Sequence, residues 1–304
     1  MTNTNVGKGA LVVPTQQVKG KMLQVWFEPK TALQDSLTYD ITAWSLPYAH
    51  GLQAVGTKSK IKYNPQKTTF LQQPISSETY AWGTTYDSFE DGKFLAALLK
   101  ANIKLRVSKK PFSSADKNWK AGSLFIIRGE NTTHLSFETT LNGLAKDFQK
   151  QLIPIASGYA SAGPDMGSND FQWIKTPKIA VLTEGEVSPY SYGELWHYFE
   201  QDLNYPFHQI RENQLSENVM KKIDVLIMPS GGYSSLNSEP KKAMIMRWLR
   251  QGGRIIAIER ALSVFEDQKA FGVKRKENKI TPDPTLRYED RKRNNISNVI
   301  TGGI

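Results

Sequence analysis

Three mostly apolar runs alternate with two helix-like segments in the second half of the chain. The runs occupy residues 178–182, 223–230 and 254–259. Between them, residues 191–203 and 239–251 carry apolar side chains at helical spacing. Continuous apolar strands joined by helical crossovers are typical of a parallel sheet that is covered on both faces. We therefore predict a βαβαβ unit across residues 177–261.

The expected ends of these two helices carry recognisable capping residues. Ser191 and Glu194 have the spacing of a capping box, which predicts that the first helix begins at Ser191. The second helix is expected to be capped by Asn237 or Ser238. Gly252 is expected to supply the left-handed residue that ends it.

A second α/β pattern occupies residues 76–160. Its first helix is predicted to begin at Ser88, because Asp91 stands at the capping-box position. A second helix is expected at residues 137–152. Strands are predicted at residues 79–83, 103–107, 123–127 and 153–156. The fold class is therefore α/β, with two small parallel-sheet units.

The remaining segments are expected to be less regular. Residues 1–75 are predicted to form an irregular, β-rich arm, with strands at residues 10–13 and 22–27. Residues 161–176 are rich in turn-forming residues and are expected to link the two units. Residues 177–304 form the second domain, which is expected to be truncated because a doubly wound sheet normally has more strands.

Composition excludes several classes of protein. The 304-residue chain has no cysteine, so disulfides and a cysteine nucleophile are excluded. Its net charge is +10, but residues 267–294, the densest basic stretch, contain only two aromatic residues. Nucleic acid is therefore not expected as a partner. The sequence also has no apolar run of about 20 residues, so we expect no membrane span.

His197 and Glu200 are the nearest approach to a metal site. A His-x-x-Glu pair on one helix can present two ligands to zinc, but a catalytic site needs a third protein ligand. His208 follows only 11 residues after His197, and the other histidines lie far upstream. We expect His197 and Glu200 to be partly exposed helix residues instead.

Three loops are expected at the carboxyl ends of the strands in residues 177–261, where parallel α/β sheets bind ligands. The ligand-binding candidates in the first two loops are Glu184, Ser188, Tyr190, Ser230, Gly231 and Gly232. The third loop holds Glu259, at the position of a nucleophile elbow in some α/β enzymes. Glu259 has no histidine near it in sequence, so an ion pair with Arg260 or with another surface basic residue is the expected role.

The chain contains, in this order, the phrases Tyr39-Asp-Ile-Thr-Ala-Trp-Ser-Leu-Pro-Tyr48, Gly163-Pro-Asp-Met-Gly-Ser168, Pro177-Lys-Ile-Ala-Val-Leu182 and Ser188-Pro-Tyr-Ser-Tyr-Gly-Glu-Leu-Trp-His197. Together these phrases resemble the region that follows the catalytic domain in large bacterial zinc carboxypeptidases of the carboxypeptidase A type. The last unit also resembles a class I glutamine amidotransferase domain, and these resemblances imply α/β units that are flavodoxin-like or amidotransferase-like. In that family the nucleophile is a cysteine, whereas this chain has Glu259, which cannot form the thioester.

The resemblance implies a non-catalytic accessory or positioning region. Its partner would be the peptidase domain of the same parent-type protein, and zinc would be bound there, with no cofactor in this chain. The family is exported, which implies the periplasm or the cell exterior, although the first residues lack a signal-peptide core and alone indicate the cytoplasm. The alternative is a module that binds a peptide, sugar or anion at the strand ends. A residual hydrolase using Glu259 is a third hypothesis.

Overall fold

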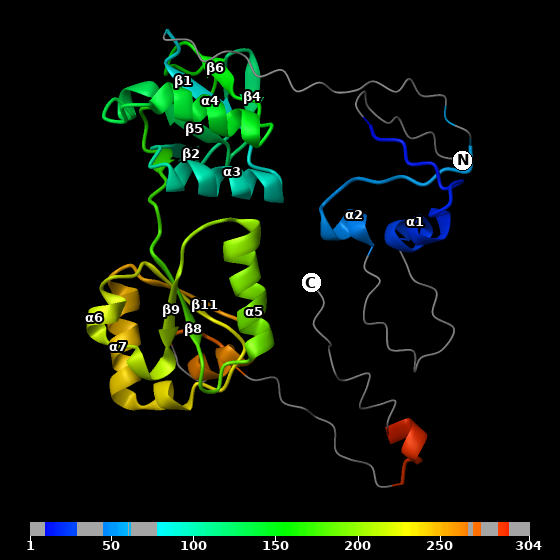
Figure 1. The fold of residues 1–304 in the computed structure, drawn as a ribbon, viewed down its shortest axis with the longest axis vertical. Coiled ribbons are helices and arrows are strands. Elements are labelled where there is room, and N and C mark those ends of the chain that lie inside the picture. Colours follow the sequence, from blue (N-terminus) through cyan, green and yellow to red (C-terminus); the bar gives the residue numbers. More distant parts are fainter. Residues whose placement is uncertain are drawn as a thin grey trace. The chain divides into compact units, whose positions relative to one another are not determined.

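The computed structural model describes residues 10–28, 45–59, 61, 78–266, 270–274 and 285–291. The chain divides into two compact units (Figure 1). One comprises residues 1–68 and 277–304, and the other comprises residues 69–276. Both large sheets belong to the second unit, so the mixed α/β class is confirmed.

The first sheet has five antiparallel strands in the order β6-β1-β5-β2-β7. Its strands are β1 (Ala81–Thr84), β2 (Arg106–Ser108), β5 (Leu124–Ile127), β6 (Ile153–Ile155) and β7 (Phe171–Trp173). The prediction of a parallel sheet here is therefore wrong. The continuous apolar character of β1 and β5 arises because every residue of both strands is buried, and an antiparallel sheet can also be covered on both faces.

Two helices cover one face of this sheet, α3 (Phe89–Lys100) and α4 (Phe137–Asp147) (Figure 1). Trp82, Leu124 and Ile126 pack against the apolar side chains of both helices. The capping box at the start of α3 is confirmed, because Ser88 accepts from the amide of Asp91 and Asp91 accepts from the amide of Ser88. Asn102, at φ 57°, lies two residues after the last residue of this helix.

The opposite face is covered by a hairpin that the sequence did not reveal. Strands β3 (Phe112–Ser114) and β4 (Lys117–Trp119) pair with each other. Phe112 and Trp119 pack with Phe125 of β5 and Phe171 of β7 in one aromatic cluster. Strand β7 lies within the predicted linker and pairs with β2, so part of that linker belongs to the first sheet.

The second sheet is parallel and has four strands in the order β11-β10-β8-β9. The three predicted strands are confirmed as β8 (Ile179–Thr183), β10 (Val225–Met228) and β11 (Arg254–Ala257). The fourth, β9 (His208–Arg211), was not predicted because only Ile210 of its residues is buried. The helices between these strands are α5 (Pro189–His197), α6 (Glu217–Met220) and α7 (Glu239–Arg250).

The start of α5 differs from the prediction. The residue that caps it is Ser188, whose hydroxyl accepts from the amide of Ser191 at 3.4 Å. Pro189 at the first helical position favours this earlier start. A π-helical turn, η2 (Tyr198–Asp202), continues α5. Short 3₁₀ turns are η1 (Arg128–Glu130), η3 (Glu212–Gln214), η4 (Ser234–Asn237) and η5 (Glu259–Phe265).

The described part of the other unit contains no strand, so the predicted β-rich arm, including its strand at residues 10–13, is wrong there. It contains α1 (Gly20–Phe27), where a strand was expected, and α2 (Leu46–Ala49). The apolar run at residues 22–27 misled the prediction, because short apolar runs fit a strand and a helix equally well. The first part of the aromatic segment, residues 39–44, and most of the charged stretch at 267–294 lie outside the described residues.

Candidate functional site

The candidate site lies at the carboxyl ends of the parallel strands β8, β10 and β11. A loop follows each of these strands, and backbone hydrogen bonds connect the first two loops. Val187 of the first loop forms an antiparallel bridge with Gly231 of the second. The amide of Ser188 also donates to the carbonyl of Ser230 at 2.8 Å. The first two loops are therefore joined along their backbones.

Glu186 extends this connection with its side chain. Its carboxylate accepts from the hydroxyl of Ser234 at 2.7 Å and from the amide of Ser234 at 3.0 Å. Its carbonyl accepts from the amide of Gly232 at 3.2 Å. The two hydrogen bonds from Ser234, and to a smaller extent the charge of Arg260, lower the pKa of the Glu186 carboxyl. The group is thus held ionised as an acceptor between two loops.

Glu212 makes a similar connection from the end of β9. It is 7% exposed, and its carboxylate accepts from both the amide and the hydroxyl of Ser235. Sequence analysis missed this residue because it did not predict β9. A sequence signal for such an acceptor was the pair Ser234-Ser235, which stands shortly before the helix predicted at residues 239–251. Serine hydroxyls and unpaired amides near the start of a helix need acceptors.

Ser188 and Ser230 are engaged within the protein. Ser188 caps α5, and the amide of Ser230 donates to the hydroxyl of Ser191 at 3.0 Å. Ser230 is itself only 6% exposed. Among these contacts, no base lies beside either serine. The contacts instead fix the start of α5 to the neighbouring loop.

Gly231 and Gly232 allow the close approach of the two loops. A Cβ atom on Gly231 would lie 2.9 Å from the carbonyl oxygen of Glu186, and one on Gly232 would lie 2.2 Å from the Glu186 carboxylate. Tyr233 follows in the left-handed region at φ 58° and is fully buried. Its hydroxyl donates to the carbonyl of Pro229 at 2.7 Å, and burial strongly raises its pKa. The glycines therefore serve packing between loops.

Glu184 and Tyr190 are the two predicted ligand-binding residues that face solvent. Glu184 lies 2.8 Å from the guanidinium of Arg211 on β9, and both side chains are 56% exposed. Tyr190 is 85% exposed in the first turn of α5. An acid, a base and an aromatic ring are thus among the groups that a ligand can reach at this end of the sheet.

Glu259 stands at the sharp turn between β11 and η5. Its φ of 49° places it in the left-handed region, which costs a non-glycine residue free energy. A strained turn from strand to helix is the backbone feature of a nucleophile elbow. The side chain is exposed, and the expected ion pair with Arg260 is not formed within the described part of the chain. Arg260 acts on Glu186 instead.

His197 and Glu200 lie on the last turn of α5 and in the π-helical turn that follows. His197 Nδ1 is 3.4 Å from the carboxylate of Asp202, and its side chain is 62% exposed. The charge of Glu200 acts on Tyr192, whose pKa is raised by burial and then by this carboxylate. Across the described residues, no group of three or more histidine, aspartate or glutamate side chains is arranged to hold a metal ion.

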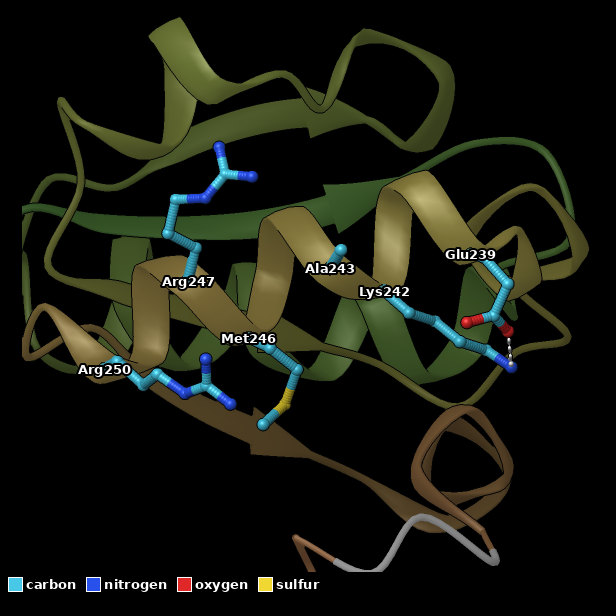
Figure 2. A pocket seen from close by; sticks show the side chains of 6 residues that line it. All are labelled: Glu239, Lys242, Ala243, Met246, Arg247 and Arg250. Carbon is cyan, nitrogen blue, oxygen red and sulfur yellow. Dashed lines mark ion pairs between the residues drawn. The ribbon is translucent and has the colours of Figure 1, made fainter.

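A hollow of about 470 Å³ lies away from these loops, on the outer face of α7 (Figure 2). It is lined by Glu239, Lys242, Ala243, Met246, Arg247 and Arg250. The sequence did not indicate it. In the part of the chain that is described, no helix has the length and apolar character needed to cross a membrane.

Comparison with known proteins yields no match: no family model, no curated protein and no solved structure is similar to the chain.

Proposed function

We propose that this chain is a non-catalytic accessory region of a zinc carboxypeptidase-like protein, one that supports or positions a separate peptidase domain. The observation that carries the proposal is the closure of the strand-end loops on one another. The carboxylates of Glu186 and Glu212 and the loop segment at Ser188 and Ser230 are bonded to neighbouring loops.

Side chains that are hydrogen-bonded to neighbouring loops in this way are poorly suited to catalysis. A general base must be free to take a proton from a substrate, and a nucleophile needs an activating base within hydrogen-bond reach. To act as a base, Glu186 would first have to give up the two hydrogen bonds that it accepts from Ser234. The polar groups of the edge therefore contribute more to a rigid scaffold than to a reaction.

The proposed partner is the peptidase domain of the same parent-type protein, which would bind the zinc. The ordered phrases at residues 39–48, 163–168, 177–182 and 188–197 support this assignment by resemblance. The same resemblance favours an exported protein, in the periplasm or outside the cell.

Binding in trans tests the accessory role. The full chain is mixed with the peptidase domain of a bacterial carboxypeptidase of the carboxypeptidase A type, produced without its own accessory region. We expect a complex in analytical ultracentrifugation and a higher melting temperature of the peptidase domain. Sedimentation as two separate species with unchanged melting would contradict the proposal. An unrelated α/β protein of similar charge serves as the control.

Glu184, Arg211 and Tyr190 favour a second candidate function, a module for a small ligand. An exposed acid–base pair, Glu184 and Arg211, and an exposed aromatic ring in the segment that follows β8 can each contact a peptide, a sugar or an anion. A thermal-shift screen with these three classes tests it. A shift that is lost in Tyr190→Ala would support the candidate, and no shift with any class would reject it.

A further inference from the structure

Three aromatic side chains form a surface cluster between α3 and the π-helical turn η2. Tyr86 precedes α3, Phe89 is the first residue of that helix, and Tyr198 is the first residue of η2. These residues are 44%, 45% and 40% exposed, although aromatic side chains contribute most to stability when they are buried. Exposed apolar groups that gather in one place indicate a contact surface. We call these three residues the aromatic patch.

The rings of the patch lie against one another and against the two elements. The ring centroids of Phe89 and Tyr198 are 5.9 Å apart, and their planes are tilted by 40°. The hydroxyl of Tyr86 lies beside α3, because a Cβ atom on Gly92 would be 3.6 Å from it. The same Cβ atom would be 4.0 Å from Leu203, the residue after η2. Tyr86 therefore lies close to both elements that carry the other two rings.

Contacts outside the patch hold these two elements together. At the other end of α3, the ammonium of Lys100 donates to the backbone carbonyl of Asn204 at 3.3 Å and to its side-chain oxygen at 2.9 Å. Tyr198 also packs on Phe199, which is buried in the core, with ring centroids 5.3 Å apart. The rings are thus positioned before any partner arrives, which lowers the entropic cost of binding.

One ring of the patch already carries a cation of the protein itself. The ammonium of Lys93 lies 5.0 Å from the centroid of Phe89, and it also pairs with Glu90 at 3.0 Å. The face of an aromatic ring has a negative partial charge and attracts a cation within about 6 Å of its centroid. This contact shows the kind of group that the patch accepts.

The segments that carry the patch are acidic. Residues 86–93 and 198–202 contain five carboxylates and one lysine. Asp91, one of the five, is paired with Lys150, so four carboxylates remain against Lys93. The whole chain, in contrast, has a net charge of +10. The local charge therefore has the opposite sign to that of the chain and is complementary to a basic partner.

Asp202 acts directly on the patch. Burial, and then the neighbouring Tyr86 and the charge of Asp202, raise the pKa of Tyr198. His197 is the basic residue beside this carboxylate, with its Nδ1 at 3.4 Å. Because the charge of Asp202 reaches the phenol of Tyr198, a cation that lies on this ring also meets a carboxylate.

We propose that the aromatic patch binds an arginine side chain in a basic segment of another protein. The guanidinium would stack on the exposed rings of Tyr86 and Tyr198, with Asp202 as its counter-charge. Arginine suits this surface better than lysine, because a planar guanidinium stacks on aromatic faces and is more weakly hydrated than an ammonium group. A peptide segment suits it better than a small free cation, which forms few contacts on an open surface. The proposal goes beyond the accessory role and does not depend on it.

Fluorescence polarisation tests the proposal on the full chain at low ionic strength. The probe is a labelled peptide in which arginine alternates with glycine, and the matched peptide has glutamine in place of arginine. We expect the arginine peptide to bind, the glutamine peptide to bind at least tenfold more weakly, and added salt to weaken binding. Choline and maltohexaose are added as competitors, and neither should displace the peptide at equal concentration. Displacement by choline would indicate a site for a free cation, displacement by maltohexaose would indicate a sugar site, and either would overturn the proposal.

Substitutions then separate the ring from the charge. Tyr198→Leu removes the ring but keeps an apolar side chain, Tyr198→Phe keeps the ring, and Asp202→Asn removes the charge. The controls are Tyr159→Leu and Asp116→Asn, which change an exposed tyrosine and an exposed aspartate outside the patch. Circular dichroism confirms that every variant is folded. Tyr86→Leu is a second ring variant and replaces Tyr198→Leu if that protein does not fold.

The expected pattern is specific to a cation held on a ring. Tyr198→Leu, Tyr86→Leu and Asp202→Asn should each weaken binding of the arginine peptide about two- to fivefold. Tyr198→Phe and both controls should bind like the wild type. A wild type that does not bind, patch variants that bind like the controls, or a Tyr198→Phe variant as weak as Tyr198→Leu would overturn the proposal. No peptidase takes part in these measurements, so their outcome is separate from that of the proposed function.

Discussion

The carboxylate of Glu186, in the loop after β8, accepts two hydrogen bonds from Ser234, in the loop after β10. The donors are the amide and the hydroxyl of one residue, 48 positions further along the chain. In parallel α/β proteins this edge of the sheet is where ligands usually bind. In this protein the side chain of Glu186 occupies part of that region.

Replacement of Glu186 by glutamine should lower the melting temperature at neutral pH but not in acid. The pKa of this carboxyl is lower in the folded protein than in the unfolded chain. The ionised Glu186 carboxylate therefore stabilises the fold at pH values above its unfolded pKa, and this stabilisation is lost as the pH falls through its folded pKa. Thermal melts of both proteins across acidic and neutral pH check this. Glu194→Gln is the exposed control, and a melting difference that does not change with pH would contradict the expectation.

Glu212→Ala should destabilise the fold more strongly. It removes a buried carboxylate and the hydrogen bonds that it accepts from the amide and hydroxyl of Ser235, which costs about 1.5–3 kcal/mol of unfolding free energy. Urea unfolding measures the change. Glu217→Ala provides the comparison, because it breaks an exposed ion pair with Arg247 that is worth about 0–1 kcal/mol. Equal effects of the two substitutions would show that Glu212 does not connect the loops.

Asp91→Asn should destabilise the antiparallel half of the second unit. Burial tends to raise the pKa of Asp91, but the hydrogen bond and charge of Lys150, with the amides of Asp87 and Ser88, outweigh it and lower the pKa. We expect a loss of about 1–2 kcal/mol at neutral pH, from the ion pair and the helix cap together.

The pH dependence of this loss has a defined direction. Because the pKa of Asp91 is lower in the folded protein than in the unfolded chain, the ionised carboxylate stabilises the fold at pH values above the unfolded pKa. The unfolding free energies of the wild type and Asp91→Asn should therefore converge as the pH falls through the folded pKa. Urea unfolding at several pH values measures both. Lys93→Met, which removes an exposed pair with Glu90 in the same helix, is the control. Curves that diverge in acid would rule out the ion pair as the cause.

Gly231→Ala and Gly193→Ala should have opposite effects. A methyl group at position 231 meets the backbone of Glu186 and Val187 at about 3 Å, so the loops must move apart at a cost of about 1–3 kcal/mol. Position 193 lies in α5 with nothing within 4 Å, and alanine there should stabilise the helix by about 0.5–1 kcal/mol. Calorimetry compares both variants with the wild type, and a stabilised Gly231→Ala would contradict the close loop contact.

Local sequence signals predicted the parallel sheet well. The strands β8, β10 and β11 are apolar runs, and α7 has a clear period, an early proline and a glycine after its end. The capping box of Ser88 and Asp91 was recognisable because it depends on residues three positions apart. Such features are fixed within a few residues and need no knowledge of the tertiary structure.

Long-range contacts account for what the sequence did not predict. Strand β9 is mostly exposed and lacks an apolar run, and with it Arg211 and Glu212 were missed. The strands of the first sheet resembled those of a parallel sheet because both faces are buried, and part of the cover comes from Phe112 and Trp119, in a hairpin that the sequence did not reveal. The roles of Glu186 and Gly231 likewise depend on a neighbouring loop.

Zinc-dependent release of C-terminal residues tests the central claim most directly. The purified chain is incubated with zinc and with peptides that end in basic, acidic or aromatic residues, and products are measured by mass spectrometry. The account predicts no release above that of the buffer, and no difference between the wild type, Glu259→Gln and Glu200→Gln. Robust release that requires zinc and is lost in either variant would contradict it.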